Sequence, residues 1–144
     1  MPYSHRSNTC TRLVAFMDAV TGRVVHWNMS HVRAKRLARC IHEMAASFPR
    51  AEKIYLVWDN WPVHATPVVQ EALRQEKRIQ VVMLPTYAPW LNHIEKLWRL
   101  LRQEVAHAHS WCDDFREFVA ALVAKLDEFS SGSQRLLHYC GLSC

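Results

Sequence analysis

Apolar and polar positions change their period several times along the chain, and the first changes predict a β-hairpin followed by a helix. Residues 12–18 and 23–29 are two apolar runs joined by a short turn that ends in Gly22, an arrangement typical of a hairpin. Over 30–48 the apolar positions follow the period of a helix with one buried face. Pro49 ends that helix. The chain is therefore expected to begin β-β-α.

Residues 54–58, Ile-Tyr-Leu-Val-Trp, form a short run without charged residues, as in a strand buried on both faces. Thr66 and Pro67 supply an N-cap and a first helical residue for a polar helix that extends to about residue 77. A second apolar run favours a strand at 79–84. The remaining pattern predicts a loop at 85–91 that is stiffened by two prolines. It also predicts two further helices, one at 92–105 and one at 115–129. The predicted order is β-β-α-β-α-β-α-α.

Two acidic residues stand at the ends of these elements. Asp59 directly follows strand 54–58, and in open α/β sheets the carboxyl ends of strands are where active sites are built. Glu95 lies at the start of the helix that Asn92 opens. Each acid also has a structural interpretation, Asp59 in an Asx turn and Asn92 with Glu95 in a capping box. The apolar pattern alone leaves both interpretations open.

Composition and charge narrow the class of protein. A length of 144 residues is typical of a single domain. Half of the residues are hydrophobic and only 3 are Gly, which is the composition of a globular protein. The net charge of +5 favours a polyanionic partner. The 5 cysteines contain no Cys-x-x-Cys pair and are expected to be reduced thiols. Without an apolar run long enough to cross a membrane, we expect a soluble, cytoplasmic protein that has no membrane partner.

Two motifs taken together carry a family resemblance. The first is Asp59-Asn60 at a strand end, followed by His64. The second is the run at 84–97, Leu-Pro-Thr-Tyr-Ala-Pro-Trp-Leu-Asn-His-Ile-Glu-Lys-Leu. The combination resembles the DDE transposases of the mariner-like superfamily, in their bacterial insertion-sequence branch. Joined in this way, the motifs favour an active-site position for Asp59 and Glu95 over the structural interpretations.

The resemblance extends loosely over 11–142, and its specificity is concentrated in 54–98. The chain departs from the family pattern at Ala88, where the family usually has Ser, and at His93, where it usually has Pro. The second motif argues against an unrelated RNase H-like nuclease.

The resemblance implies an α/β RNase H-like fold, which begins β-β-β-α-β with a first catalytic Asp on its first strand. Because only two strands precede the first predicted helix, we expect the fold to lack its first strand and to carry a carboxyl-terminal helical extension. Residues 1–144 would then be a single, truncated DDE catalytic domain, with the first Asp and a helix-turn-helix region upstream. Asp18 is the local candidate for the missing acid, although an Asp at a hairpin turn ordinarily binds backbone amides.

The resemblance also implies DNA transposition, with strand cleavage and strand transfer at a two-metal site that binds Mg²⁺ or Mn²⁺. Asp59 and Glu95 are the expected catalytic residues and metal ligands, and the isolated chain is expected to be inactive. The partners would be transposon-end and target DNA, with a homodimer or an upstream transposase segment. The residues expected to contact nucleic acid are Asn60, His64, Lys96, Arg99 and Arg102.

Several alternatives remain open from the sequence. His64 either contacts phosphate or packs beneath the loop, and the basic residues of the 92–105 helix form either a phosphate-binding stripe or a solvated face. For Tyr87 and Trp90 we favour packing over stacking on DNA. The competing function is a non-catalytic RNase H-like remnant that binds DNA or a partner subunit. The presence or absence of a first Asp distinguishes it from a live transposase.

Overall fold

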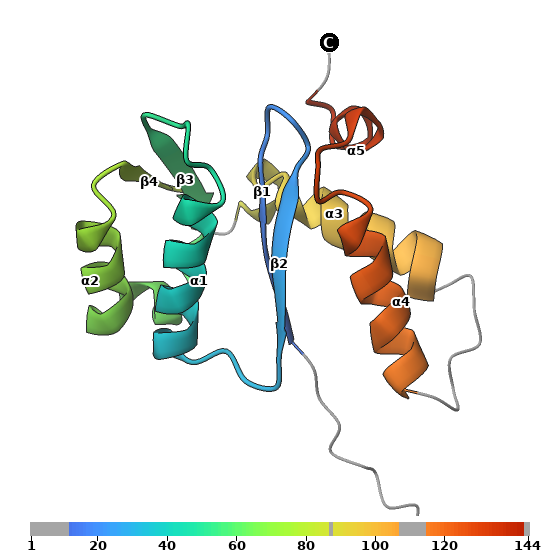
Figure 1. The fold of residues 1–144 in the computed structure, drawn as a ribbon, viewed down its shortest axis with the longest axis horizontal. Helices are drawn as coiled ribbons and strands as arrows, with labels where there is room; N and C mark the ends of the chain where they lie inside the picture. The colour runs from blue at the N-terminus through green and yellow to red at the C-terminus, as the bar shows by residue number, and fades with distance from the viewer. Residues whose placement is uncertain (1–11, 87, 107–114, 143–144) are drawn as a thin grey trace, which may run out of the picture.

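Two small β-sheets and the helices around them make up a mixed α/β fold (Figure 1). The computed structural model describes residues 12–86, 88–106 and 115–142. The strands are β1 (Arg12–Met17), β2 (Val24–Met29), β3 (Ile54–Trp58) and β4 (Ile79–Met83). The helices are α1 (Ala34–Ala46), α2 (Pro67–Gln75), α3 (Ile94–Leu101), α4 (Phe115–Asp127) and α5 (Gln134–Tyr139). Short 3₁₀ turns lie at Pro62–Ala65 and Pro89–Leu91, and α3 continues as a π-helix at Arg102–Ala106.

The predicted hairpin is confirmed. β1 and β2 pair antiparallel, and the Asp18 amide donates to the Arg23 carbonyl at 2.8 Å to close the turn. Gly22 donates to the Asp18 carbonyl at 2.9 Å and has a φ of +74°, which residues with a Cβ rarely adopt. This turn also contacts the α4–α5 connection, because Ser133 donates its amide to the Thr21 carbonyl at 2.9 Å.

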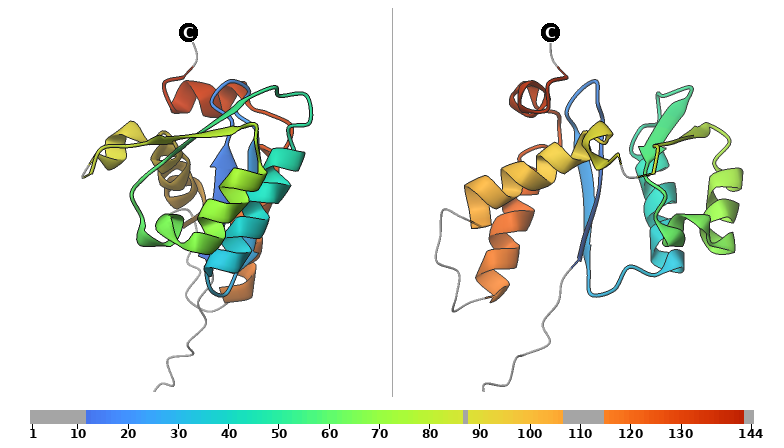
Figure 2. Two further views of the ribbon diagram at one scale, coloured as in Figure 1. Left: turned by 90° about the vertical axis from the view of Figure 1, so that its left-hand side faces the viewer. Right: turned by 180° about the vertical axis from the view of Figure 1, so that it is seen from behind.

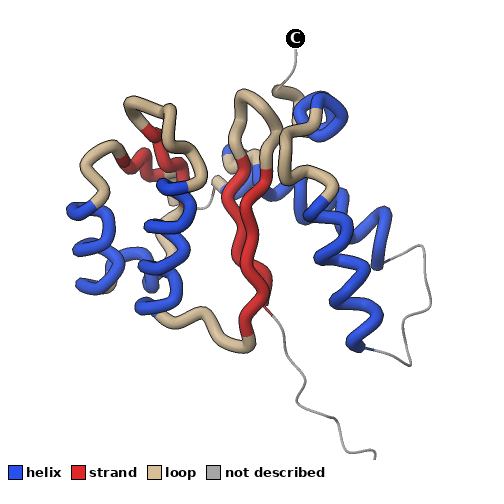
Figure 3. The backbone as a smooth tube through the Cα atoms, in the orientation of Figure 1, coloured by secondary structure: helices blue, strands red, loops and turns tan. Residues whose placement is uncertain are grey.

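β3 and β4 form a separate parallel pair, joined by α2 (Figure 3). The prediction that strand 54–58 is buried on both faces is wrong. Leu56 and Trp58 are buried, whereas Tyr55 and Val57 are 61% and 45% exposed. The reason is that β3 has a strand neighbour on one edge only and helix cover on one face. β3 therefore has the sequence pattern of a central strand but lies at the edge of a two-stranded sheet.

The helix starts differ in detail from those predicted. Pro67 is the first residue of α2, as expected, but the Thr66 hydroxyl donates backward to the Val63 carbonyl at 2.8 Å and caps no helix amide. α3 begins at Ile94, two residues after the predicted Asn92. The Asn92 side-chain oxygen accepts from the Ile94 amide at 3.3 Å, so Asn92 still organises the start of this helix.

Buried side chains form two clusters. The helices that contribute to them lie on opposite sides of the hairpin, α1 and α2 on one side and α3 and α4 on the other (Figure 2). One joins α1 and α2 to β3, with Ile41 and Val69 fully buried. The other joins α3, α4 and α5 to β2, with Leu97, Leu126 and Leu136 fully buried. Helix α5 was not predicted from the apolar pattern. It begins where the Ser133 hydroxyl accepts from the Leu136 amide at 3.1 Å.

The mixed α/β class predicted from the sequence is confirmed, and its small sheets and several helices are compatible with an RNase H-like fold. Within the part of the chain that the structure describes, every helix is too short or too polar to cross a bilayer.

Candidate functional site

A groove of about 660 Å³ lies between the β1 edge of the hairpin and β3. Its walls are mostly apolar, and its floor and ends are completed by side chains from α1 and from the start of α3. Of the predicted site residues, Asp59, His64 and Glu95 line this groove, and so does Asp18. The two acids singled out in the sequence therefore line the same groove.

Asp59 takes its position from the strand before it. The side chains of Leu56 and Trp58 are buried in the core between β3 and α1, which holds the end of β3 in place. Asp59 follows immediately, with its side chain 63% exposed. The carboxylate is therefore open to solvent while the backbone that carries it is fixed.

His64 is tied to Asp59 by the 3₁₀ turn that follows it. The imidazole stacks on the Trp58 ring at 3.9 Å between centroids and 6° between planes, and it meets Trp61 edge-on. Its Nδ1 lies 2.9 Å from the Asp59 carbonyl oxygen and 3.7 Å from Asp59 Oδ1. Because a carbonyl only accepts, Nδ1 carries the proton in this hydrogen bond. The packing alternative for His64 is therefore realised, and its role is to hold the turn that carries Asp59.

Glu95 lies in the first turn of α3, and the buried Leu97 and Leu101 fix the helix that carries it. Among the described residues, the Glu95 carboxylate has no hydrogen-bond or ion-pair partner. The capping box is thus not formed, since the helix start is bound by the Asn92 side chain instead. Glu95 presents a free carboxylate to the groove.

Asp18 is engaged by its own turn. Its Oδ1 accepts from the Val20 amide at 2.9 Å, and its Oδ2 accepts from the Thr21 hydroxyl at 2.8 Å. Both oxygens are used in the way that Asp side chains ordinarily stabilise turns. The structure thus gives Asp18 a structural role at the end of β1.

The remaining predicted residues lie outside the groove. Asn60 is exposed beside Asp59, and Lys96, Arg99 and Arg102 are exposed along α3 and its π-helical continuation. Arg99 and Arg102 follow Glu95 by four and seven residues, so they share its side of the helix. Burial raises the pKa of the Cys140 thiol, and the Lys96 charge lowers it.

The donor set of the groove is too small for a metal site by itself. Carboxylate oxygens are the ligands that Mg²⁺ and Mn²⁺ prefer, and Asp59 and Glu95 supply them. In the described ranges, however, no three or more His, Cys, Asp or Glu side chains are grouped closely enough to hold a metal ion.

Two features of this region were not found by sequence reasoning, and the first is the exposure of two tryptophan side chains. Trp90 is 74% exposed, so the prediction that it packs is wrong. Tyr87, for which packing was also predicted, lies outside the described residues. Trp61, which lines the groove, is 45% exposed.

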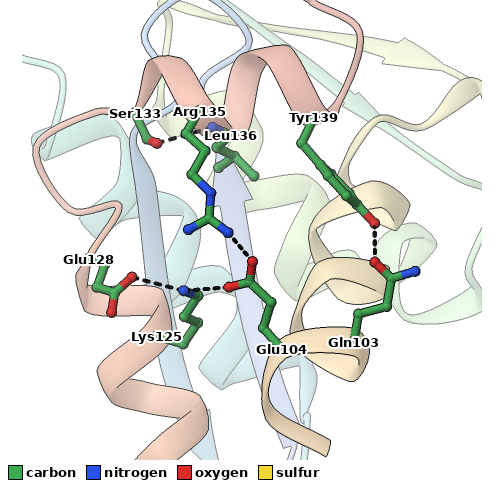
Figure 4. Close-up of polar contacts among 8 residues, drawn as sticks. All are labelled: Gln103, Glu104, Lys125, Glu128, Ser133, Arg135, Leu136 and Tyr139. Atoms are coloured by element: carbon green, nitrogen blue, oxygen red, sulfur yellow. Dashed lines mark hydrogen bonds and ion pairs between the residues drawn. The ribbon is translucent and has the colours of Figure 1, made fainter. Parts of the chain in front are cut away.

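The second feature is an ion cluster that fastens the Glu95 helix to the carboxyl-terminal helices (Figure 4). Glu104 in the π-helix accepts from Lys125 of α4 at 2.5 Å and from Arg135 of α5. Glu128 approaches Lys125 at 3.1 Å. The Lys125 hydrogen bond lowers the pKa of Glu104, and Glu104 raises the pKa of Lys125. The only signal in the sequence was the spacing of Lys125 and Glu128 on one helix.

Comparison with known proteins identifies the family of the chain. Residues 2–118 match the family described as DDE superfamily endonuclease. The insertion element IS630 uncharacterized 39 kDa protein of Shigella sonnei is 32% identical over 69 residues, which are 48% of this chain and 20% of that protein. The aligned part thus spans one fifth of the relative's length. The chain belongs to the DDE superfamily endonucleases, and part of it is similar to a protein of a bacterial insertion element.

Proposed function

We propose that the groove is one part of an active site for metal-dependent DNA strand cleavage and strand transfer in transposition, with Asp59 and Glu95 as catalytic metal ligands. The observation that carries this proposal is that both carboxylates line one groove, each exposed and each held by a rigid element. An aspartate at a strand end and a glutamate in a facing helix are oxygen donors aimed at a shared space. Divalent ions bound there would stabilise the charge that develops on a phosphodiester under attack.

The chain is proposed to work together with a further segment. Two-metal sites place their ions about 3.5–4 Å apart and need more anionic ligands than two side chains supply. Among the described residues the groove has no third free carboxylate, because Asp18 is engaged by its turn. A truncated RNase H-like domain accounts for this shortage of carboxylate ligands. Its first strand and first Asp would come from an upstream segment or a partner transposase chain.

DNA is the proposed substrate. The net charge of +5 and the exposed Arg99 and Arg102 beside Glu95 suit contacts with phosphates, which position DNA without reading its sequence. Lys96 and Asn60 are also exposed outside the groove lining, and we include them among the residues that would contact DNA.

A cleavage assay with complementation tests this function. The chain alone, with labelled transposon-end DNA and Mg²⁺ or Mn²⁺, is expected to give no nicks. Adding the polypeptide encoded directly upstream should restore metal-dependent cleavage. Asp59→Ala and Glu95→Ala should each abolish that activity, whereas Glu71→Ala, which removes an exposed acid paired with Arg74, should not. Restored cleavage that survives both substitutions would refute the assignment.

The competing function is a non-catalytic remnant that binds DNA or a partner subunit. The small donor set of the groove favours it as the second candidate. It predicts DNA binding without cleavage under every complementation tried.

A further inference from the structure

We propose that the exposed face of α1 binds the phosphate backbone of an arm of duplex DNA, separate from the DNA beside α3, and leads it to the Asp59 end of the groove. The surface consists of four basic residues, here called the α1 patch: Arg33, Lys35, Arg36 and Arg39. Its affinity for a polyanion stands on charge and exposure. Only the arrival of this DNA at an active site rests on the proposed function.

The α1 patch is a cluster of cations without compensating charge. All four side chains are exposed, and among the described residues none of them has a hydrogen-bond or ion-pair partner. The sequence has no Asp or Glu between Asp18 and Glu43. The Glu43 carboxylate, at the far end of the helix, accepts a hydrogen bond from the Trp27 indole. The positive charge of the patch is therefore left for an external anion.

Three cations of the patch are neighbours on one side of the helix. Arg39 follows Lys35 by four residues and Arg36 by three, a spacing that places side chains next to each other on a helix surface. Like charges at this spacing destabilise a helix. The opposite side of α1, with Ile41 and Ala45 fully buried, is fixed in the core. Core packing thus holds the cations together, and a bound polyanion would relieve their repulsion.

The acidic residues of the neighbouring helix α2 do not neutralise the patch. Glu71 pairs with Arg74 of the same helix, and Glu76, which follows α2, pairs with His42 of α1 at 2.8 Å. Both carboxylates already have a cationic or hydrogen-bonding partner. The charge of the patch is consequently a property of the surface that α1 and α2 form together.

The chemistry of this face favours DNA over a membrane or a protein partner. α1 has no exposed large apolar side chain, whereas a membrane-binding helix needs an exposed apolar face and a protein interface needs an apolar centre. From residue 33 to residue 39 the helix rises about 9 Å. Duplex DNA carries one phosphate charge per about 1.7 Å of its axis, so about five phosphates lie along that length. The four cations of the patch are suited to this charge density.

A second hollow connects the patch to the groove. It has a volume of about 500 Å³, lies at the start of β1, and is lined by the exposed Arg12 and by His31, which precedes α1. Trp61 lines both this hollow and the groove that contains Asp59. DNA bound along α1 would therefore pass Arg12 and His31 before it reaches Asp59.

The α1 patch and the basic residues of α3 lie on different sides of the molecule. Figure 2 shows α1 and α2 on one side of the hairpin and α3 and α4 on the other. Arg99 and Arg102 accompany Glu95 on α3, whereas the patch leads to Asp59. Strand transfer brings two DNA segments to one site, and two basic surfaces beside one groove provide a place for each segment.

Binding of a 16-base-pair duplex without metal tests the patch. Arg36→Ala with Arg39→Ala should lower the slope of log affinity against log salt by about 2, since each phosphate contact contributes about 0.9. Arg50→Ala with Lys77→Ala removes the same charge from exposed positions outside the patch and should lower the slope by less than about 0.5. Fluorescence anisotropy across salt concentrations measures both slopes.

Separate arms predict separate effects of the two surfaces. In NMR titrations the duplex should shift the amide signals of residues 33–39 even when Arg99 and Arg102 are both replaced by Ala. The patch variant should lose these shifts and keep those of α3. Shifts at residues 33–39 that disappear with the α3 substitutions would show a single binding surface and overturn the proposal.

Urea unfolding distinguishes a binding role from a structural one. Ala is the best helix former, and its introduction at residues 36 and 39 removes the repulsion between like charges. The midpoint of unfolding of the patch variant at low salt should therefore equal or exceed that of the unsubstituted chain. A lower midpoint would show that these side chains stabilise the fold, and would overturn the interpretation of the patch as an uncompensated surface.

A complex complemented by the upstream polypeptide distinguishes two sources of the DNA arm. If the patch variant loses strand transfer and keeps cleavage, the arm is target DNA; if it loses both, the arm is the DNA next to the cleaved end. A slope change no larger than that of the control would overturn the proposal, and so would loss of binding to anionic lipid vesicles with DNA binding unchanged. The binding tests use neither metal nor cleavage, so failure of the proposed function would leave their outcome standing.

Discussion

Gly22 and Gly141 adopt nearly the same left-handed backbone, with φ of +74° and +73°, but their surroundings differ. A Cβ added at Gly22 would stand 2.3 Å from the Ser133 carbonyl oxygen, whereas one at Gly141 meets nothing within 4 Å. The hairpin turn thus packs its backbone directly on the connection between α4 and α5. Only glycine permits that approach at residue 22.

These two glycines give a matched pair of substitutions. Gly141→Ala should destabilise the fold by about 1 kcal/mol, which is the ordinary cost of a left-handed alanine. Gly22→Ala carries the same cost plus the displacement of Ser133, and we expect about 2–4 kcal/mol in total. Urea unfolding of both variants measures the difference. Equal effects would show that the backbone at Ser133 yields without cost.

Protonation of Glu104 is expected to make the free energy of unfolding depend on pH. Its pKa is lowered from 4.5 in the folded chain, mainly by the Lys125 hydrogen bond, so it binds its proton less readily when folded. Its contribution to the free energy of unfolding is present above about pH 4.5 and lost as the pH falls through the folded pKa. At the other limit, the raised pKa of Lys125 means that its contribution is lost only above 10.5.

Glu104→Gln should therefore lower the free energy of unfolding by about 1–2 kcal/mol at pH 7. The difference from the unsubstituted chain should shrink as the pH falls from 4.5 through the lowered pKa of Glu104, where the folded chain takes up this proton. Denaturant unfolding at both pH values checks this. Glu71→Gln, in an exposed pair with Arg74, is the control and should change stability by less than about 0.5 kcal/mol. A difference independent of pH would contradict the electrostatic explanation.

At the scale of elements, the carboxyl end of α1 is held by two arginines from distant segments. Arg78 donates to the carbonyls of Ala45, Phe48 and Ala51 at 2.7–2.8 Å. Arg23 lies over the Phe48 ring at 5.0 Å from its centroid. The last carbonyls of a helix have no partner within it, and these side chains supply one. Because Phe48 lines the groove, the contacts of Arg78 and Arg23 at the end of α1, here called the clamp, also fix a wall of the candidate site.

Arg78→Ala would remove three charge-assisted hydrogen bonds, and of the three carbonyls only those of Ala45 and Phe48 keep a backbone donor. We expect a decrease of about 2–3 kcal/mol in the free energy of unfolding. Arg74→Ala, four residues earlier and bound only to the exposed Glu71, should cost less than about 0.5 kcal/mol. Thermal and urea unfolding of the two variants make the comparison. Similar decreases for both would mean that the clamp at the end of α1 contributes little.

At the scale of the whole molecule, charge governs the expected interaction with DNA. With a net charge of +5, phosphate contacts should provide nearly all the affinity. We expect non-specific binding with a Kd of roughly 10⁻⁴–10⁻⁶ M at physiological salt, weakening steeply as salt rises. Mobility-shift titrations across salt concentrations test this. Tight, sequence-selective binding that persists at high salt would reveal a dedicated recognition element in the chain.

The basic residues of α3 can be tested in the same assay. Arg99→Ala with Arg102→Ala should reduce the slope of log affinity against log salt by about 1 for each phosphate that the variant no longer binds. Arg50→Ala with Lys77→Ala removes the same charge from exposed positions outside α3 and is the control. Equal slopes for the two double variants would assign Arg99 and Arg102 to a solvated face.

Local pattern was enough to predict most elements. The apolar run at 12–17 and the helical period before Pro49 depend on neighbours a few residues away, and the structure has a strand and a helix there. Helix α5 was missed because its six residues are too short for a period to show. The Glu104 cluster was missed because Arg135 lies 31 residues away along the chain.

The sequence by itself determined which two acids stand at the ends of elements, and the motifs by which the chain resembles DDE transposases. Those properties reside in residue types and short spacings. Only the tertiary structure decided that Tyr55 and Val57 stand at an open edge, that Asp18 is engaged by its own turn while Glu95 is free, and that β1 and β3 face each other across a groove. Strand neighbours and side-chain partners are long-range contacts, and no local period encodes them.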